Sequence, residues 1–391
     1  MDTERIRRVR EAMQSAVVDA LVCRLPENVL MLSGYWPLVG WSFLVFPKDG
    51  EPTCIIPHSE EQETREELWG GECISFLFGV LGAGNPYEDI AIALRAASVG
   101  RGWRRVGYEG SFESVAPPWN AAEPAIPADI TRGILREAFG DQALVDATEL
   151  LTSQRACKTA AEADKLRIVN EISNFGLRAF SERVAVGVSG VELVAAVEHA
   201  IMTQGTGYKG AKRVRAFAQV ATGPAETVVG FRPMEISTLR KMQPGDLALL
   251  ELGVVADGFW SDRTRVRVAG EPTPQQTAVF EAVKAAQAAA IEKVRAGVTA
   301  GEVDEAARAV IRDAGYEKEF VHVTGHGVGL RYHEPIPIIH PGSELVLEQG
   351  MVHSVEPGVY IPEMGGIRLE DDVLVTQTGA EVLGAFSGDL A

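Results

Sequence analysis

An internal repeat in the second part of the chain sets the strongest limit on its fold. Gly187–Leu193 and Gly297–Val303 align at a constant offset of 110 residues (297 − 187), and both carry the S/T-x-x-E pattern of a helix-capping box. Each helix predicted to follow ends at a glycine, Gly205 or Gly315, with the same offset. The repeat predicts a duplicated α/β unit: a pseudo-twofold domain with helices outside a curved sheet and a ligand site at the junction. Chance agreement of short capping motifs is the alternative.

The first part of the chain alternates strand-like and helix-like segments, which indicates an α/β layer arrangement. Its glycines form neither a phosphate loop nor a dinucleotide fingerprint, and no residue in it points to catalysis. A long helical pattern begins near Thr159 and opens the part that contains the repeat. A length of 391 residues suits two domains, which we place at residues 1–152 and 153–391.

The net charge and the cysteine content of the chain limit which binding partners and which cellular compartment are expected. The net charge of −17 argues against nucleic acid and anionic membranes as partners. Four cysteines without C-x-x-C spacing suit a reducing compartment. Residues 1–16 are predicted to form a charged amphipathic helix, not a secretory signal. The uncharged stretch Asn28–Phe46 is interrupted by Pro37, so we expect two short buried strands there instead of a membrane span. With no secretory signal and no membrane span expected, we predict a cytoplasmic protein.

A β-hairpin is predicted around Asp257-Gly258, which favours a type I′ turn between two apolar, alternating runs. That turn would place Gly253 opposite Asp262 and bring Glu251 onto the neighbouring diagonal, with both carboxylates projecting the same way. Two acids on an otherwise apolar face repel each other unless a positive charge lies between them, and a metal ion is the simplest candidate. The alternative is a solvated face with a Glu–Arg pair.

Further candidates for metal binding follow in the second half of the repeat. His326 stands between two glycines, and Glu356 ends a strand-like segment before a proline. Glu370 opens a run of three acids within a single strand predicted over residues 366–373. Each has an ordinary structural alternative, namely a histidine in a glycine-rich loop or a solvated acid at a strand end. With the hairpin they make one imidazole and four carboxylates, an oxygen-rich set that suits Mn, Co, Fe or Zn at a two-metal site.

At this point the sequence resembles the pita-bread metallopeptidases, which include methionine aminopeptidase, aminopeptidase P, prolidase and the non-metallic creatinase. The resemblance extends over essentially the whole chain and implies an N-terminal three-layer creatinase/prolidase-type domain followed by a pita-bread (α+β) catalytic domain. Methionine aminopeptidases usually lack the extra domain, so the proline-peptidase branch is favoured. The segments that carry the resemblance are Pro26–Val29, Ser33–Tyr35, Arg155–Lys158 with Glu162, Phe320–Leu330 with His333-Glu334, Ser354–Pro362 and Gly366–Asp372.

The resemblance implies a metal role for five residues. Asp262 and Glu370 would bridge two divalent ions, and His326 and Glu356 would be terminal ligands of one of them. Glu251 stands where the family has Asp. Its extra methylene adds about 1.5 Å of reach, so the second ion could be shifted, weakened or missing, and we expect Glu251 to ligate one ion.

The resemblance also implies roles in catalysis and substrate binding. Glu356 would relay a proton to the leaving nitrogen, His333 would donate to the tetrahedral oxyanion, and Arg368 and Tyr360 would orient carboxylates. The family's peptidases carry a histidine in the loop before the hairpin, and this chain has none there. Arg232 in that loop is a candidate for binding a substrate carboxylate, and an exposed loop arginine is the alternative.

These expectations combine into a cytoplasmic, metal-dependent Xaa-Pro peptidase that acts on short peptides, with manganese as the favoured ion and a homodimer as the favoured assembly. Two alternatives stay open. One is a hydrolase of a small non-peptide amide or amidine, as in creatinase. The other is a pita-bread binding protein without catalysis.

Overall fold

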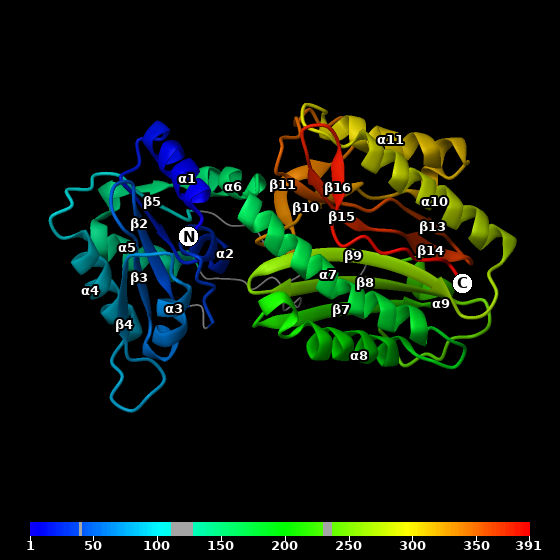
Figure 1. Cartoon of the computed structure of the whole chain (residues 1–391), viewed down its shortest axis with the longest axis horizontal. Coiled ribbons are helices and arrows are strands. Elements are labelled where there is room, and N and C mark those ends of the chain that lie inside the picture. Colours follow the sequence, from blue (N-terminus) through cyan, green and yellow to red (C-terminus); the bar gives the residue numbers. More distant parts are fainter. Residues whose placement is uncertain (39–40, 111–127, 230–236) are drawn as a thin grey trace. The chain divides into compact units, whose positions relative to one another are not determined.

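The computed structural model describes residues 1–38, 41–110, 128–229 and 237–391 (Figure 1). It divides the chain into two compact units, Met1–Arg155 and Ala156–Ala391. Within the described parts of the chain, no helix combines the length and the apolar character that crossing a bilayer requires.

The first unit contains a mixed α/β layer arrangement, as predicted. Its strands form one six-stranded sheet in the order β4-β3-β2-β1-β5-β6, and helices α4 and α5 share its hydrophobic core. The strands are β1 (Ala20–Cys23), β2 (Phe43–Pro47), β3 (Thr53–Pro57), β4 (Glu72–Phe76), β5 (Val106–Tyr108) and β6 (Leu144–Asp146). The helices are α1 (Thr3–Ser15), α2 (Pro26–Ser33), α3 (Glu61–Glu67), α4 (Pro86–Ser98), α5 (Ala128–Phe139) and α6 (Thr148–Ala156), the last of which runs across the division.

The prediction of two strands within Asn28–Phe46 is half wrong. β2 is a buried strand, but the first apolar run belongs to helix α2. Pro26 occupies the first turn of α2, and Gly34 ends the helix with a left-handed φ of 82°. A short apolar run fits a buried helix as well as a buried strand, so the helix-end residues carried the distinguishing signal.

The second unit consists of two halves, each with helices outside strands (Figure 1). The first half contains α7 (Ala160–Arg183), α8 (Gly190–Ala200), α9 (Gly223–Thr227) and the antiparallel strands β7 (Val214–Thr222), β8 (Leu247–Ala256) and β9 (Phe259–Val268). The second half contains α10 (Pro274–Lys293), α11 (Ala300–Asp313), β10 (Gly325–Gly327), β11 (Glu334–Ile339), β12 (Val352–Val355), β13 (Gly358–Ile361), β14 (Gly365–Arg368), β15 (Asp371–Val375) and β16 (Ala380–Val382).

The predicted capping boxes both form, one in each half. Ser189 caps α8 and Thr299 caps α11, and in each box the side chain and the backbone exchange hydrogen bonds with a glutamate three residues on. A third capping box at Thr159 starts α7, where the long helical pattern was predicted to begin. The repeat in the sequence therefore corresponds to a repeat of helix starts in the structure.

The predicted β8–β9 hairpin is confirmed in turn and register. Asp257 and Gly258 have φ values of 50° and 88°, which a type I′ turn requires, and Gly253 pairs with Asp262. The hairpin meets the second half through an antiparallel bridge between Thr264 and Glu370. That bridge joins the sheets of the two halves at the place where the candidate ligands gather.

Candidate metal centre

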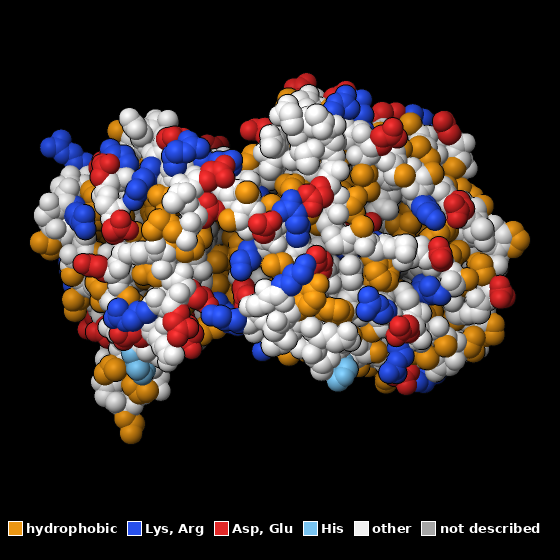
Figure 2. Space-filling model, in the orientation of Figure 1, with side chains coloured by type: hydrophobic (Ala, Val, Ile, Leu, Met, Phe, Trp, Pro, Cys, Tyr) orange, Lys and Arg blue, Asp and Glu red, His pale blue; other side chains and the backbone are white. Residues whose placement is uncertain are grey.

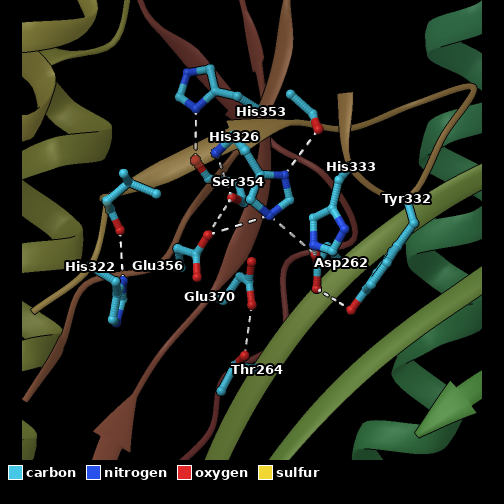
Figure 3. Close-up of polar contacts among 12 residues, drawn as sticks. Asp262, Thr264, His322, His326, Tyr332, His333, His353, Ser354, Glu356 and Glu370 are labelled. Atoms are coloured by element: carbon cyan, nitrogen blue, oxygen red, sulfur yellow. Dashed lines mark hydrogen bonds and ion pairs between the residues drawn. The ribbon is translucent and has the colours of Figure 1, made fainter. Parts of the chain in front are cut away.

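The two hairpin carboxylates form one side of the candidate centre. Figure 3 shows Asp262 in its place beside His326, His333 and Glu370. Glu251 lies on β8 and Asp262 on β9. Each offers an oxygen to a group, shared with Glu370, whose ligand atoms all lie within 4.8 Å of one another. The two side chains therefore face the same space, as the alternation of the hairpin predicted.

His326 faces these carboxylates from β10, which is an inner strand of its sheet and not the loop that its glycines suggested. A Cβ at Gly325 would lie 2.0 Å from the Ser354 carbonyl oxygen, so only glycine permits the close approach of the neighbouring strand. The His326 Nδ1–H donates to the carbonyl of Gly327 at 3.0 Å. The lone pair of Nε2 is thereby turned toward Asp262 Oδ2 and Glu356 Oε1, each 3.4 Å away.

Glu356 and Glu370 complete the set from the second half. Glu356 follows β12 directly and accepts a hydrogen bond from the Ser354 hydroxyl at 3.2 Å. Glu370 lies between β14 and β15, so the single strand predicted over residues 366–373 is wrong: it breaks at this residue. The break lets Glu370 bridge to Thr264 of the other half, whose hydroxyl donates to Glu370 Oε2 at 2.6 Å.

The two acids after Glu370 do not join the group of candidate ligands. Asp371 pairs with Arg263 and Arg265. Asp372 Oδ2 accepts the backbone N–H of Asp262 at 3.0 Å, so it supports the strand that carries a candidate ligand. Burial raises the pKa of Asp372 to about 6. Of the three consecutive acids, only Glu370 belongs to a candidate metal-ligand group among the described residues.

Glu251 is the most heavily hydrogen-bonded acid of the set. Its Oε1 accepts from the Tyr332 hydroxyl at 2.6 Å. Its Oε2 lies 3.1 Å from the Thr264 hydroxyl oxygen and pairs with the Arg368 guanidinium. Burial acts to raise the pKa of Glu251, but Arg368 and Tyr332 outweigh it and bring the pKa to about 2. The longer side chain therefore places its carboxylate between a cation and two hydroxyls.

The residues predicted to assist catalysis surround this group. The His333 ring lies 4.4 Å from the His326 ring, and His333 Nε2 is 3.8 Å from Asp262 Oδ2. Burial and the neighbouring His326 lower the pKa of His333 to about 3, so its imidazole is neutral at neutral pH. Arg368 Nη1 donates to the Tyr360 hydroxyl at 3.0 Å, and its Nε donates to the Thr264 hydroxyl.

Comparison with known proteins identifies the family. A model of metallopeptidase family M24 matches residues 164–377, and a model of the creatinase/prolidase N-terminal domain matches residues 5–157. The chain belongs to metallopeptidase family M24. Its two units thus correspond to the predicted fold class, a creatinase-type domain followed by a pita-bread domain.

Members of the family resemble the chain over most of its length. An Xaa-Pro dipeptidase of Pyrococcus furiosus is 30% identical over 381 residues, covering 97% of each chain. An Xaa-Pro dipeptidase of Lactobacillus delbrueckii subsp. lactis is 30% identical over 333 residues, covering 85% of this chain and 83% of that one. The crystal structure of the prolidase from Pyrococcus horikoshii covers 100% of both chains with a TM-score of 0.80 and 27% identity.

Membership of a metallopeptidase family implies a divalent metal, and the residues of this M24 site fit one. Asp262 Oδ2 and Glu370 Oε1 are buried and have no hydrogen-bond partner in the part of the chain that the structure describes. Burial raises the pKa of both carboxyls well above their usual range, and the facing carboxylates raise it further. A cation would relieve this repulsion and would also receive the lone pair of His326.

Two residues of the M24 site were not predicted. The His322 Nδ1–H donates to the Val323 carbonyl, which leaves Nε2 to accept from the Tyr360 hydroxyl at 3.0 Å. Arg368, Tyr360 and His322 thus form one hydrogen-bonded chain. His322 stands four residues before His326, and that spacing was a signal by which it could have been predicted. The second unpredicted residue is Tyr332, and its position next to His333 in the sequence gave no such signal. The predicted Arg232 lies outside the described residues.

Proposed function

We propose that this member of family M24 is an Xaa-Pro peptidase that hydrolyses short peptides with divalent cations held by Glu251, Asp262, His326, Glu356 and Glu370. The observation that carries the proposal is the convergence of these five side chains from both halves of the second unit. Support for the substrate class comes from the relatives of nearly equal length that are Xaa-Pro dipeptidases.

We assign two cations to two positions. The first cation position comprises His326, Glu356 and Glu370, and the second comprises Glu251, Asp262 and Glu370. Asp262 Oδ2 also lies 3.4 Å from His326 Nε2, which favours Asp262 and Glu370 as the bridging pair. Carboxylates with one imidazole favour Mn²⁺, and Co²⁺, Zn²⁺ or Fe²⁺ suit the same donors. When bound, the cations supply an acidified water and polarise the scissile carbonyl.

The less buried side chains are proposed to handle protons and the substrate. The Glu356 side chain is 13% exposed and that of His333 20%, whereas that of Asp262 is 1% exposed. Glu356 therefore lies where it can take a proton from the attacking water and deliver it to the leaving nitrogen. The neutral imidazole of His333 donates an N–H to the oxyanion of the tetrahedral species. Arg368 Nε, 4.0 Å from Glu356 Oε2, orients that carboxylate.

Substrate binding, assembly and compartment complete the proposal. Arg232, which precedes the hairpin in the sequence, is the candidate for binding the substrate carboxylate. We propose a cytoplasmic homodimer that binds no nucleic acid and no membrane. On the face drawn in Figure 2, the Lys and Arg side chains of the described residues are interspersed with Asp and Glu and form no basic stripe, which agrees with the net charge of −17.

The test is hydrolysis of an Xaa-Pro dipeptide and an Xaa-Pro-Xaa tripeptide, with the matching Xaa-Ala peptides as controls, before and after chelation and after addition of Mn²⁺. We expect turnover of a proline peptide that disappears on chelation and returns with Mn²⁺. Preference for the dipeptide or the tripeptide separates the dipeptidase from the aminopeptidase form.

The opposite results identify the two alternatives. A protein that binds metal, leaves all peptides intact and hydrolyses a small amidine is the creatinase-like hydrolase. A protein that binds no metal and turns over no substrate is the non-catalytic binding protein.

A further inference from the structure

The Tyr332 hydroxyl lies between the two hairpin carboxylates of the second cation position, Glu251 and Asp262. Figure 3 shows its contact with Asp262. Its oxygen is 2.6 Å from Glu251 Oε1 and 3.0 Å from Asp262 Oδ1. The side chain is only 2% exposed, so water does not compete freely for these contacts. A phenol has one proton, which is therefore shared between the two acceptors. Tyr332 thus ties together one oxygen of each carboxylate.

The ring of Tyr332 is held firmly enough to place this hydroxyl. It packs against the rings of Trp260 at 5.7 Å and of His333 at 4.4 Å, with Phe217 edge-on at 6.3 Å. The ring also lies directly on β8 at Gly253, where a Cβ would come within 2.7 Å of it. Because the ring is enclosed on several sides, the direction of its hydroxyl is set by packing and not by the carboxylates alone.

The hydroxyl determines which oxygens remain for a cation. With Oδ1 held by Tyr332, Asp262 turns its Oδ2 toward His326 Nε2. Glu251 has one more rotatable bond than Asp, and the phenol and Arg368 hold its two oxygens from opposite ends. A side chain with more freedom needs more contacts to present its oxygens in one arrangement.

We propose that Tyr332 is a positioning residue for the second cation position: its hydroxyl orients Glu251 and Asp262 and so sets the affinity of that position for its ion. The proposal rests on the proposed two-cation function. Partners that orient metal ligands typically contribute about 10–100-fold in metal affinity. The first cation position shares the proposed bridging residues Asp262 and Glu370. Tyr332 holds only the Oδ1 atom of Asp262, whereas the oxygen of Asp262 that faces His326 is Oδ2, so the affinity of the first position is expected to change far less.

The test is titration of the metal-free full-length protein with Mn²⁺ by calorimetry, for wild type, Tyr332→Phe and Tyr35→Phe. The phenylalanine at position 332 keeps the ring and removes only the hydroxyl. Tyr35 is the matched control, since its buried hydroxyl lies in the other unit and has no hydrogen-bond partner in the described ranges. We expect Tyr332→Phe to weaken the second ion about 10–100-fold and to leave the first near its wild-type affinity. Tyr35→Phe should bind both ions as wild type does.

Electron paramagnetic resonance of the same samples is a second readout that general instability would not imitate. At two Mn²⁺ per chain, the wild type should give the spectrum of a coupled pair, and Tyr332→Phe the spectrum of an isolated ion. Two ions bound by Tyr332→Phe with wild-type affinities would overturn this inference alone. A wild type with a single ion would overturn it together with the second cation position, and a wild type with none would overturn the proposed function as well.

Discussion

The hairpin of the first half and the strands of the second half supply the same kind of side chain but hold it differently. Glu251 on the hairpin is paired with Arg368, and its pKa is lowered to about 2. Glu370 from the second half has the Thr264 hydroxyl as a donor, and burial with the facing Glu356 raises its pKa. Glu251 therefore carries its charge without a metal, whereas ionisation of Glu370 is disfavoured and would be helped by a cation. Each half also supplies the partners of the other half's carboxylate.

Asp262→Asn should have the largest effect on this balance. Asp262 is fully buried and is the proposed bridge, so its loss leaves two like-charged ions without enough negative charge between them. We expect metal binding and peptide hydrolysis to disappear together, measured by metal content after dialysis and by peptide turnover. Asp257→Asn in the turn of the same hairpin is the matched control, because its carboxylate lies outside the candidate metal centre and accepts the backbone N–H groups of Lys212 and Arg213. A mutant that keeps both metal and activity would contradict the bridging role.

Glu251→Gln should separate the two cation positions. The change keeps the size of the side chain, removes its charge and takes from the buried Arg368 its nearest carboxylate partner. We expect the affinity for the second ion to fall by more than the about 10–100-fold typical of losing a residue that only orients a ligand, while the first ion is retained, measured by Mn²⁺ titration. Loss of both ions, as expected for Asp262→Asn, would show that the two carboxylates act as one unit and would remove the contrast between them.

The effect of pH on stability should differ between the metal-free and metal-loaded protein. The pKa values of Asp262 and Glu370 are raised in the folded state, so their contribution is fully present below the unfolded pKa values, near 4, and is lost as pH rises. A bound cation removes that loss, because it replaces the protons. We therefore expect the rise in thermal midpoint on adding Mn²⁺ to be larger at pH 8 than at pH 6.

Comparing the metal-loaded with the metal-free protein at each pH separates the contribution of Asp262 and Glu370 from that of the buried histidines. Burial lowers the pKa of His353 to about 4 and that of His333 to about 3, and these shifts act in the opposite direction below pH 6.5 in both samples. A gain on adding Mn²⁺ that shrinks from pH 6 to pH 8 would contradict the assignment of Asp262 and Glu370 as the acids that need the ion.

The smallest effects are expected at the helix caps. Mutating them compares the stability of the two halves at positions away from the metal centre. Ser189→Ala and Thr299→Ala remove equivalent side-chain acceptors at the starts of α8 and α11. Each should lower the free energy of unfolding by about 0.5–2 kcal/mol, measured by denaturant unfolding, with unchanged Mn²⁺ affinity. A clearly unequal loss would show that the repeated capping boxes are not energetically equivalent.

Local patterns in the sequence predicted much of the second unit. The turn at Asp257-Gly258, the capping boxes at Ser189 and Thr299 and the start of α7 all depend on residues within a few positions of one another. Such signals act through short-range sterics and hydrogen bonds, which one stretch of sequence contains in full. The prediction of a strand before β2 was wrong because a short, uniformly apolar run shows no periodicity that distinguishes a helix from a strand.

By itself, the sequence determined the residue types of the site, the hairpin register that brings Glu251 beside Asp262, and the family to which the motifs point. Only the tertiary structure decided that Glu370 leaves its strand to bridge to Thr264, that Arg368 pairs with Glu251, and that Tyr332 reaches both hairpin carboxylates. The physical reason is distance along the chain. These contacts join residues between 70 and 117 positions apart, and they form only when the two halves pack against each other and shut out water.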